Sequence, residues 1–463
     1  MISFSGVKIQ GDLIPVEIIL VYLMIFSIPN ENTVHLTKYS DMADNLATLR
    51  KYNFWDDQPQ LLGFIRDEYL DRIKGFIGNR LIKVLVGQRR TGKSYVLRQI
   101  IGTLINGGVE PKNMVYINKE YTDFDFINNY SDLEGLILVY RQELQPRGKI
   151  YLFIDEVQGI DGWEHLINSY SQNFTDDYEI FISGSNSNLL SGEMASLLSG
   201  RCIQFQIFPF SYREFIAVHQ LENMKTSFLS YLQTGGLPEL IHLPNEETKR
   251  HYLSAMRDTV LLRDIIQRFN VKDARLLEDI FSFLVNNASN LISISNIINY
   301  FTGKNRKTNY ETIANYIDHL KNTYLVHQAE RFSIKGKEII AGNSKYYIND
   351  LSFKNYLYPG FAYGLGYMLE NIVYLQLLNS GYNVYVGYIR NKEIDFVVTK
   401  NDRTIYIQTT YLLIDKTTIE REYAQLESIP DNFEKYVVSL DDIQLPNRNG
   451  IQHILAWHLN EIL

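Results

Sequence analysis

The stretch Gly87-Gln88-Arg89-Arg90-Thr91-Gly92-Lys93-Ser94 decides the fold of this chain. It matches the phosphate-binding pattern G-x-x-x-x-G-K-[ST] in full. The residues before it, LIKVLV (81–86), predict a buried strand. The residues after it, SYVLRQIIGTLI (94–105), have apolar side chains at helical spacing. In this strand–loop–helix order, backbone N–H groups and the positive end of a helix dipole converge on one point, which suits a phosphate group.

Each residue type in the loop has a chemical reason to be there. Glycine lets the backbone curl, and the Lys93 ammonium can reach the outer phosphates of a nucleotide. The hydroxyl of Ser94 can ligate magnesium. We therefore expect the nucleotide to be bound by Gly87, Gln88, Arg89, Arg90, Thr91, Gly92, Lys93, Ser94 and Tyr95. The alternative is a glycine turn that precedes Lys-Ser by chance, and the flanking strand and helix argue against it.

A second stretch, KIYLFIDE (149–156), is an apolar strand that ends in two adjacent carboxylates. In a parallel sheet the carboxyl ends of the strands face the ligand. We expect Asp155 to bind magnesium together with Ser94, and Glu156 to act as the general base that orients the attacking water. Glu156 and Lys93 are thus the predicted catalytic residues, and ATP and Mg²⁺ the predicted ligands. The alternative is a strand that ends in a solvated acidic turn.

Composition limits the class of protein. The chain has 463 residues, enough for two to four domains, with 45% hydrophobic and 21% charged residues, a globular balance. The formal net charge of −8 argues against broad, nonspecific coating of nucleic acid. Because Cys202 is the single cysteine, the chain can form no internal disulfide and no cysteine-rich zinc site. These features predict a cytoplasmic protein.

The first 45 residues are expected to be an extension whose authenticity is doubtful. Their apolar run, Ile18–Ile28, is shorter than the roughly 20 residues that span a membrane, and Pro29 ends it. Three alternatives stay open: translation from an upstream start codon, a weak membrane anchor, or a packed helix. We favour the first, with Met42 as the start, and expect no membrane association.

Residues 46–215 are expected to form the nucleotide-binding core and residues 216–275 a helical lid. Apolar spacing predicts helix within 54–77. Strands are predicted at 114–118, 149–155, 179–183 and 202–208. The polar turn at 184–187 can touch the terminal phosphate or be an ordinary turn. Arg201 is a candidate arginine finger, although a surface salt bridge is the preferred interpretation.

Residues 276–355 are expected to form a winged helix. Helices predicted at 276–287, 295–300 and 309–322 precede strands at 325–332 and 345–348. If the segment reads DNA, the candidate contacts are Lys304, Arg306, Lys307, Asn309, Tyr310, Thr312 and Asn315. Since residues 276–350 carry eight basic and seven acidic side chains, a protein-contacting role is equally compatible with the sequence.

Residues 356–463 are expected to form a last α/β domain. The predicted order is a helix at 365–378, strands at 383–388, 393–399 and 404–411, a helix at 417–427 and a strand at 435–440. The segment at 451–462 completes the chain.

The whole order of motifs resembles a widespread prokaryotic family of AAA+-like ATPases that end in a restriction-endonuclease-like domain of unknown function. The resemblance covers residues 50 to 463. It rests on the phosphate loop, the Ile-Asp-Glu strand, and the Ser-Gly-Ser-Asn, Leu-Ser-Gly-Arg and Gly-Gly-Leu-Pro-Glu motifs. It implies an α/β P-loop ATPase with a parallel sheet, then a winged helix and a PD-(D/E)xK-like α/β domain. It implies ATP binding and hydrolysis but no biological partner.

The last domain departs from the nuclease pattern that the resemblance implies. Glu370 fits the helix carboxylate and Asp395 the strand aspartate, but the E-x-K position reads Gln408-Thr409-Thr410. A neutral amide is a poor magnesium ligand, and Thr410 cannot supply the charge of a lysine. We expect no nuclease activity, although Lys400, Arg403 or Lys416 could replace the lysine and Glu393 the carboxylate.

Three functions compete on the sequence alone. The first is an ATP-driven switch that acts on an unknown protein or DNA partner, with the oligomeric state left open. The second is an ATP-gated nucleic-acid-processing enzyme, which Gln408 and Thr410 disfavour. The third is a nucleotide-binding scaffold without hydrolysis, which Asp155 and Glu156 together disfavour.

Overall fold

The computed structural model describes residues 8–9, 12–13, 45–56, 61–190, 198–359, 364–390 and 392–463, without the side chains of residues 8, 9, 12, 13, 188, 190, 262 and 263. Most of the expected N-terminal extension, including its apolar run, lies outside these residues. The chain divides into two compact units. The first comprises Met1–Gln60 and Ile105–Glu179, and the second comprises Leu61–Leu104 and Ile180–Leu463.

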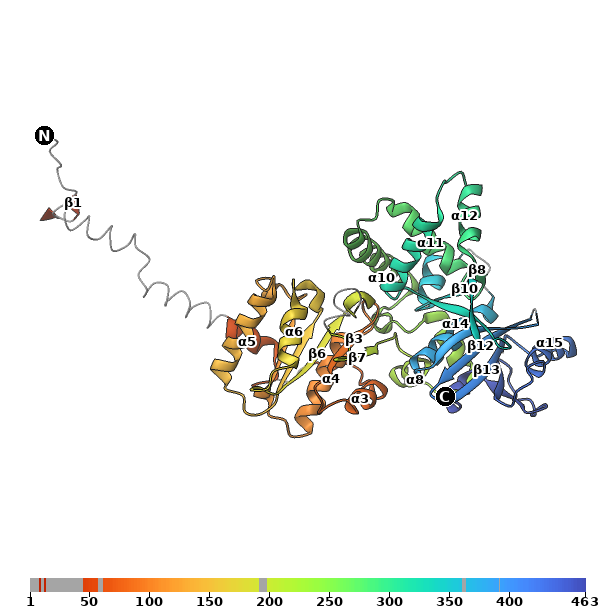
Figure 1. Cartoon of the computed structure of the whole chain (residues 1–463), viewed down its shortest axis with the longest axis horizontal. Coiled ribbons are helices and arrows are strands. Elements are labelled where there is room, and N and C mark those ends of the chain that lie inside the picture. Colours follow the sequence, from red (N-terminus) through yellow and green to blue (C-terminus); the bar gives the residue numbers. More distant parts are fainter. Residues whose placement is uncertain are drawn as a thin grey trace. The chain divides into compact units, whose positions relative to one another are not determined.

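The predicted parallel sheet is present (Figure 1). Its five strands follow the order β4-β5-β6-β3-β7. They are β3 (Ile82–Val86), β4 (Met114–Asn118), β5 (Ile150–Asp155), β6 (Tyr178–Gly184) and β7 (Cys202–Gln206). The pairs β4–β5, β3–β6 and β3–β7 are parallel. Every residue of β3, β4 and β6 is buried, which is why their sequences are mostly apolar.

In the first unit, the helices α5 (Tyr130–Leu144) and α6 (Trp163–Ser171) accompany β4 and β5. Asn129 begins α5 with a capping box: its side chain accepts from the N–H of Asp132, and Asp132 accepts from the N–H of Asn129. Residues 45–52 are helical as well, and the short strands β1 (Lys8–Ile9) and β2 (Asp12–Leu13) pair antiparallel.

The helix predicted within 54–77 is shorter than its apolar spacing suggested. Among the described residues of this range, 54–56 and 61–77, only α3 (Asp67–Lys74) is α-helical. The preceding residues take a non-helical path in which Gly63 has a φ of +61°. The backbone of this path is held by the Gln99 side chain, whose Nε2 donates to the carbonyls of Leu62 and Phe64 (both 2.7 Å). A tertiary contact thus replaces the helical hydrogen bonds that the spacing had predicted.

In the second unit, α4 (Lys93–Asn106) leaves the phosphate loop, and a series of helices follows β7. They are α8 (Tyr212–His219), α9 (Lys225–Thr234) and α10 (Glu246–Thr259), which continues as a π-helical segment, Val260–Gln267. Most of these helices fall within residues 216–275, and the assignment of that segment as a lid stays a prediction. No helix among the described residues is long and apolar enough to cross a membrane.

The next segment has the order helix, strand, helix, helix, strand, strand. Its elements are α11 (Ala274–Asn286), β8 (Leu291–Ile292), α12 (Ile294–Gly303), α13 (Tyr310–Asn322), β9 (Val326–Ser333) and β10 (Glu338–Ile348). The strand β8 was not predicted, because two residues give no period. Between Ile340 and Lys345 the register of β10 against β9 shifts, which marks a bulge.

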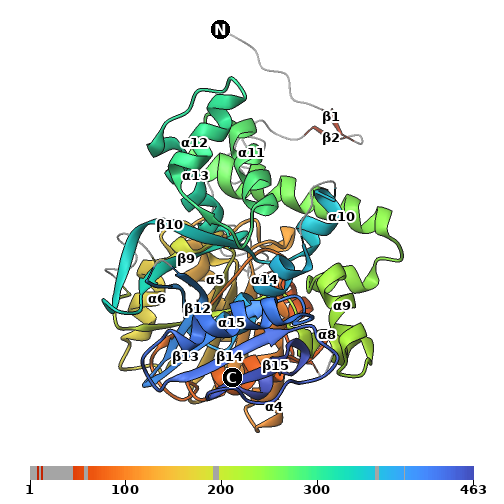
Figure 2. The same cartoon turned by 90° about the vertical axis from the view of Figure 1, so that its right-hand side faces the viewer.

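The strands β8, β9 and β10 belong to the same sheet as the last part of the chain (Figure 2). The order is β15-β14-β13-β12-β11-β9-β10-β8, and β11 pairs with β9 in parallel. The remaining elements are α14 (Leu365–Asn379), β11 (Asn383–Ile389), β12 (Lys392–Lys400), β13 (Arg403–Thr410), α15 (Lys416–Glu427), β14 (Glu434–Ser439) and β15 (Ile451–Leu455). The sheet therefore continues across the expected boundary at 355/356.

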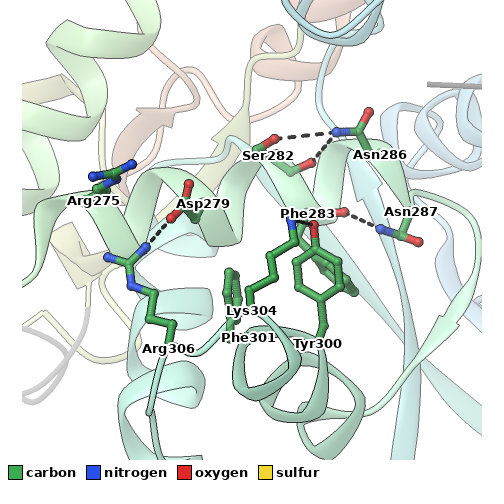
Figure 3. A pocket seen from close by; sticks show the side chains of 10 residues that line it. All are labelled: Arg275, Asp279, Ser282, Phe283, Asn286, Asn287, Tyr300, Phe301, Lys304 and Arg306. Carbon is green, nitrogen blue, oxygen red and sulfur yellow. Dashed lines mark hydrogen bonds and ion pairs between the residues drawn. The ribbon is translucent and has the colours of Figure 1, made fainter. Parts of the chain in front are cut away.

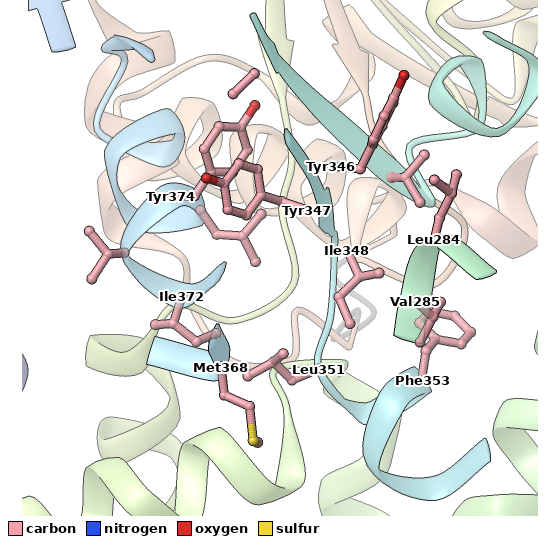
Figure 4. Close-up of a cluster of buried hydrophobic side chains, with 14 of the residues drawn as sticks. Leu284, Val285, Tyr346, Tyr347, Ile348, Leu351, Phe353, Met368, Ile372 and Tyr374 are labelled. Carbon is pink, nitrogen blue, oxygen red and sulfur yellow. The ribbon is translucent and has the colours of Figure 1, made fainter. Parts of the chain in front are cut away.

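One large apolar core contains residues from all of these segments (Figure 4). The rings of Tyr347 on β10 and Tyr374 on α14 stack with centroids 3.9 Å apart. Leu284 and Val285 on α11 and Phe353 pack in the same cluster. The helix α14 is buried on most of its sides, which explains its largely apolar sequence; its buried polar residues are Glu370, Asn371, Gln376 and Asn379.

Candidate functional site: a phosphate loop and the pocket beside it

The predicted phosphate loop joins β3 to α4, as the sequence indicated. Gly87 has a φ of +147° and Gly92 a φ of +97°. A Cβ added at Gly87 would lie 2.3 Å from the carbonyl oxygen of Ile207, a backbone atom that cannot give way. The first glycine is therefore required by close approach to the chain after β7, and the second by its left-handed backbone.

Lys93 is the first residue of α4 and is almost fully buried. Its Nζ donates to the carbonyl oxygens of Gly87 (3.0 Å) and Gln88 (3.1 Å), so the ammonium lies across the loop. Ser94 is half-buried in the first turn of the helix. The positive charge, the hydroxyl and the N-terminus of α4 thus lie in one place, as anion binding requires.

Arg66, which the sequence analysis did not single out, connects the phosphate loop to other segments of the chain. Its buried guanidinium makes two 2.7 Å hydrogen bonds to the carboxylate of Glu214 on α8. It also donates to the carbonyls of Thr91 (3.0 Å) and Phe208 (2.9 Å). A bidentate arginine–carboxylate pair is rigid. Arg66 therefore positions the loop relative to the segment after β7 and to α8.

A cavity of about 240 Å³ opens directly beside the loop. Thr91 and Gly92 form its loop side, and most of the other lining residues are apolar or aromatic: Gly63, Phe64, Tyr95, Phe210, Val218, Pro238 and Ile241, with Arg66, Glu239 and His242. The rings of Phe64 and Phe210 meet edge to face, 5.5 Å apart. Ligand pockets usually measure about 300–1,000 Å³, so this one suits a single flat ring system rather than a whole nucleotide.

Of these pocket residues the sequence analysis predicted Thr91, Gly92 and Tyr95, which belong to the loop and the start of α4. The others come from three further segments of the chain, and no local pattern indicated that they share a pocket. The one available signal was Gly63, whose Cβ would lie 2.7 Å from the Tyr95 ring. A glycine so close to the loop helix marks a tight contact, but its significance emerges only with the fold.

The two carboxylates at the end of β5 belong to the first unit. Asp155 is fully buried, and its Oδ2 accepts from the Tyr116 hydroxyl (2.7 Å) and the Asn118 amide (3.0 Å). Burial and the charge of Asp155 raise the pKa of Tyr116 well above its ordinary value, so Tyr116 stays a donor. Glu156 has a left-handed backbone (φ +54°), and its carboxylate accepts from Gln158. Such strain at a polar strand end is typical of functional positions.

Two further loop side chains contact elements far along the chain. The Oε1 of Gln88 accepts from Asn349 Nδ2 (2.8 Å), just after β10. The Nε of Arg89 is 2.6 Å from Asp264, in the π-helical segment after α10. Gln88 is fully buried, and its Nε2 has no hydrogen-bond partner among the described residues. A buried, unpaired donor destabilises by about 1–3 kcal/mol.

The other predicted positions near the loop differ in burial. Ser185 and Asn186, in the polar turn after β6, are buried, whereas Ser187 donates to Asn322 on α13 (2.8 Å). Arg201 is exposed, and its backbone carbonyl accepts from Ile82 at the start of β3 (2.8 Å). The arginine-finger role of Arg201 stays a prediction.

A larger cavity, of about 890 Å³, lies between α11 and α12 (Figure 3). Several candidate DNA contacts have structural partners here. Arg306 pairs with Asp273 (2.9 Å) and Asp279, and the Lys304 ammonium donates to the Tyr300 hydroxyl (2.5 Å). Asn309 caps α13 by accepting from the N–H of Thr312. Tyr310 is 62% exposed and stays available to a partner.

Glu370 and Asp395, which the sequence analysis compared with nuclease positions, lie close together beside Lys345. Glu370 on α14, Glu393 and Asp395 on β12, and Lys345 on β10 form one charge cluster. Lys345 was not predicted there. Of the expected replacements for the missing lysine, Lys400 donates to the carbonyl of Ser380, and Arg403 pairs with Glu434.

Comparisons with known protein families match two segments of the chain. A model of the family described as AAA domain matches residues 79–216, which contain the loop and both carboxylates. A second model, described as a domain of unknown function (DUF8612), matches residues 225–363.

Solved structures give weaker likenesses. The Walker-type ATPase PABY2304 of Pyrococcus abyssi is 16% identical with a TM-score of 0.44, over 64% of this chain and 96% of that one. The Aeropyrum pernix ORC1 protein, solved in complex with DNA, is 12% identical with a TM-score of 0.32, over 67% of this chain and 97% of that one. Both TM-scores are below 0.5, so neither structure is used to infer a property of this chain.

Two relatives match most of the chain. An uncharacterised protein of Haemophilus influenzae is 34% identical over 402 residues, covering 85% of this chain and 98% of its own length. The uncharacterised protein MJ1544 of Methanocaldococcus jannaschii is 31% identical over 392 residues, covering 80% of each chain. This chain therefore belongs to the same family as these two proteins, and its residues 79–216 are an AAA domain.

Proposed function

We propose that this protein is a Mg²⁺-dependent ATPase that acts as a nucleotide-driven switch on a protein or DNA partner in the cytoplasm. The observation that carries the proposal is the apolar pocket beside the phosphate loop. The loop alone fits any phosphate. A loop joined to an aromatic-lined pocket of the size of one base fits a nucleotide.

In this proposal the base lies near Phe64, Tyr95 and Phe210, and the phosphates lie on residues 87–94. Lys93 neutralises the outer phosphates. Ser94 and Asp155 would hold Mg²⁺, since a hydroxyl and a carboxylate are the hard oxygen ligands that it prefers. When bound, Mg²⁺ neutralises charge that develops on the transferred phosphoryl group. Glu156 would orient the attacking water and accept its proton.

The switch part rests on the contacts of Gln88 and Arg89. Gln88 and Arg89 belong to the loop that would hold the phosphates, and their side chains bind Asn349 and Asp264. The Nε2 group of Gln88 has no hydrogen-bond partner among the described residues, so a rearrangement of the loop that gives it one would be stabilising. Nucleotide binding would therefore bias the contacts of the loop with the helical lid and with the end of β10.

The base pocket is tested by binding two ligands that share the phosphates but not the base. Phe64→Ala should weaken ATP binding about tenfold, the equivalent of roughly 1.4 kcal/mol of lost ring packing. It should leave the binding of inorganic tripolyphosphate unchanged. Phe174→Ala, at a phenylalanine that is 89% exposed, is the matched control. Equal loss for both ligands would mean that the pocket does not hold the base.

The hydrolysis step is tested at Lys93 and Glu156. Lys93→Ala should abolish ATP binding, because it removes the ammonium that lies across the loop. Glu156→Gln should bind ATP but turn it over about 10²–10⁴-fold more slowly. Lys112→Ala, at a half-exposed surface lysine, should behave as wild type. Wild-type turnover in Glu156→Gln would show that another group orients the water.

We also infer the nature of the segments that follow. The order of elements from α11 to β10, with the strands arranged β9-β10-β8, fits a winged helix. Arg306 pairs with Asp273 and Asn309 caps α13, so both side chains already have partners within the segment. A protein-contacting role is therefore favoured over the reading of DNA bases.

For the last domain we infer a PD-(D/E)xK-like arrangement without nuclease activity. Incubation with supercoiled plasmid and RNA in Mg²⁺ or Mn²⁺ should give no nicking, and nicking lost in Asp395→Ala would contradict this.

A further inference from the structure

The charge cluster between β10, α14 and β12 contains one ammonium and three carboxylates. Lys345 Nζ lies 2.8 Å from Glu370 Oε1, 2.7 Å from Glu393 Oε1 and 3.5 Å from Asp395 Oδ1. The side chains of Lys345, Glu370 and Asp395 are 4%, 8% and 10% exposed. The ammonium thus occupies the position toward which the three carboxylates converge.

The carboxylates are also oriented by neutral donors. The backbone N–H and the hydroxyl of Thr409 both donate to Asp395 Oδ2 at 2.8 Å. The hydroxyl of Tyr347 donates to Glu370 Oε1 at 2.8 Å. Gln408, at the position where a nuclease would carry a carboxylate, accepts from the backbone N–H of Asp395 (3.3 Å). The cluster is therefore held together by its own residues.

The charges within the cluster are balanced by the same groups. Burial lowers the pKa of Lys345, but Glu370, Asp395 and Glu393 outweigh this and raise it, so Lys345 stays charged. Burial also raises the pKa of Glu370, to about 8, against the opposing effect of the Lys345 ammonium.

We propose that the ammonium of Lys345 is the resident cation of this carboxylate site and takes the place of a divalent metal ion. Converging carboxylates are the ligands that hard divalent cations such as Mg²⁺ and Mn²⁺ require. An ammonium fixed at their centre repels such an ion and fills its space.

In this proposal the carboxylates could bind a divalent metal ion once the ammonium of Lys345 is removed. Removal of the ammonium leaves buried carboxylates without a cation, an arrangement that strongly favours binding a replacement. A chain without Lys345 should therefore gain a Mn²⁺ site formed by Glu370, Glu393 and Asp395. This inference is independent of ATP binding, because it concerns a different site and is tested without nucleotide.

The experiment titrates Mn²⁺ itself into the nucleotide-free, full-length protein and follows the free ion by electron paramagnetic resonance. Lys345→Ala should bind one Mn²⁺ at least tenfold more tightly than wild type, and Mn²⁺ should raise its melting temperature. The double variant Lys345→Ala/Asp395→Asn should lose this gain. Lys345→Arg, which keeps the positive charge, should bind Mn²⁺ as weakly as wild type.

Two results would overturn the proposal. One is a folded Lys345→Ala variant that binds Mn²⁺ no better than wild type. The other is Mn²⁺ binding by the wild type that Asp395→Asn removes, because the ammonium would then not fill the site. This second comparison uses only proteins that retain Lys345, so it decides the question even if Lys345→Ala does not fold. Folding of Lys345→Ala only when Mn²⁺ is present would support the proposal.

Discussion

At the scale of single residues, two buried cations organise the second unit. Arg66 joins Glu214 to the backbone of the phosphate loop, and Lys345 gathers three carboxylates. Each is surrounded by acceptors, because an unpaired charge in an apolar interior is unfavourable by several kcal/mol. Such side chains therefore determine which segments must lie together.

The Lys345 cluster predicts a pH dependence of stability. The pKa of Glu370 is raised from 4.5 to about 8, mainly by burial. The folded protein keeps a proton that the unfolded chain releases within this window, so Glu370 makes the protein less stable as the pH rises from about 4.5 to 8. The Glu370→Gln variant has no titratable group at this position and serves as the reference. The free energy of unfolding of wild type minus that of Glu370→Gln should therefore fall by on the order of 1–3 kcal/mol between those limits.

Chemical denaturation of both proteins at several pH values measures this difference. Asp350 is also buried, and its pKa is raised to about 6, but it titrates in both proteins and cancels. A difference that does not change with pH would contradict the ionisation assigned to Glu370.

At the scale of elements, the sequence predicts what local patterns determine. The strand Met114–Asn118 and the loop–helix junction at Lys93 follow from apolar runs and glycine positions alone. The sequence could not predict that the path at 62–66 is held by Gln99, or that β10 brings Lys345 to Glu370. These contacts join segments far apart in the chain, so no periodicity encodes them. For the same reason the loop was predicted and the pocket beside it was not.

The ion pair between the loop and the π-helical segment gives a prediction at this scale. The carboxylate of Asp264 is buried beside Arg89 and lowers the positive potential of the loop. Asp264→Asn should therefore tighten ATP binding about three- to tenfold, or roughly 1 kcal/mol. Asp258→Asn is the matched control: Asp258 pairs with Arg257 at 2.7 Å in the preceding helix. Equilibrium binding of ATP to the three proteins measures the effect, and weaker binding by Asp264→Asn would contradict it.

At the scale of the whole molecule, the eight-stranded sheet is the feature that matters most. It runs from β15 to β8 and takes strands from both sides of residue 355. Its parallel contact between β9 and β11 runs from Arg331 to Ser333 on β9. Residues on the two sides also share the apolar core and the Lys345 cluster. The two halves of this sheet are thus one folding entity.

A chain cut within this sheet tests that statement. A chain that ends at residue 355 exposes the edge of β9 and leaves Lys345 without its three carboxylates. It should aggregate during purification. A full-length chain with a protease site between residues 359 and 364, cleaved after folding, should elute from a sizing column as one particle. Separation of the two fragments without denaturant would show that the sheet does not hold them.

The bulge in β10 has a consequence for the evolution of the family. Ile340 pairs with Arg331 and Lys345 with Ala329, so five steps along β10 correspond to two along β9. Because side chains alternate between the two faces of a strand, an odd excess of three residues decides which face Lys345 occupies. Wherever homologous chains keep a lysine here, insertions and deletions within 341–344 should come in twos. A single-residue gap would turn the ammonium to the opposite face. The frequency of such gaps in aligned homologues therefore indicates whether selection has maintained the cluster.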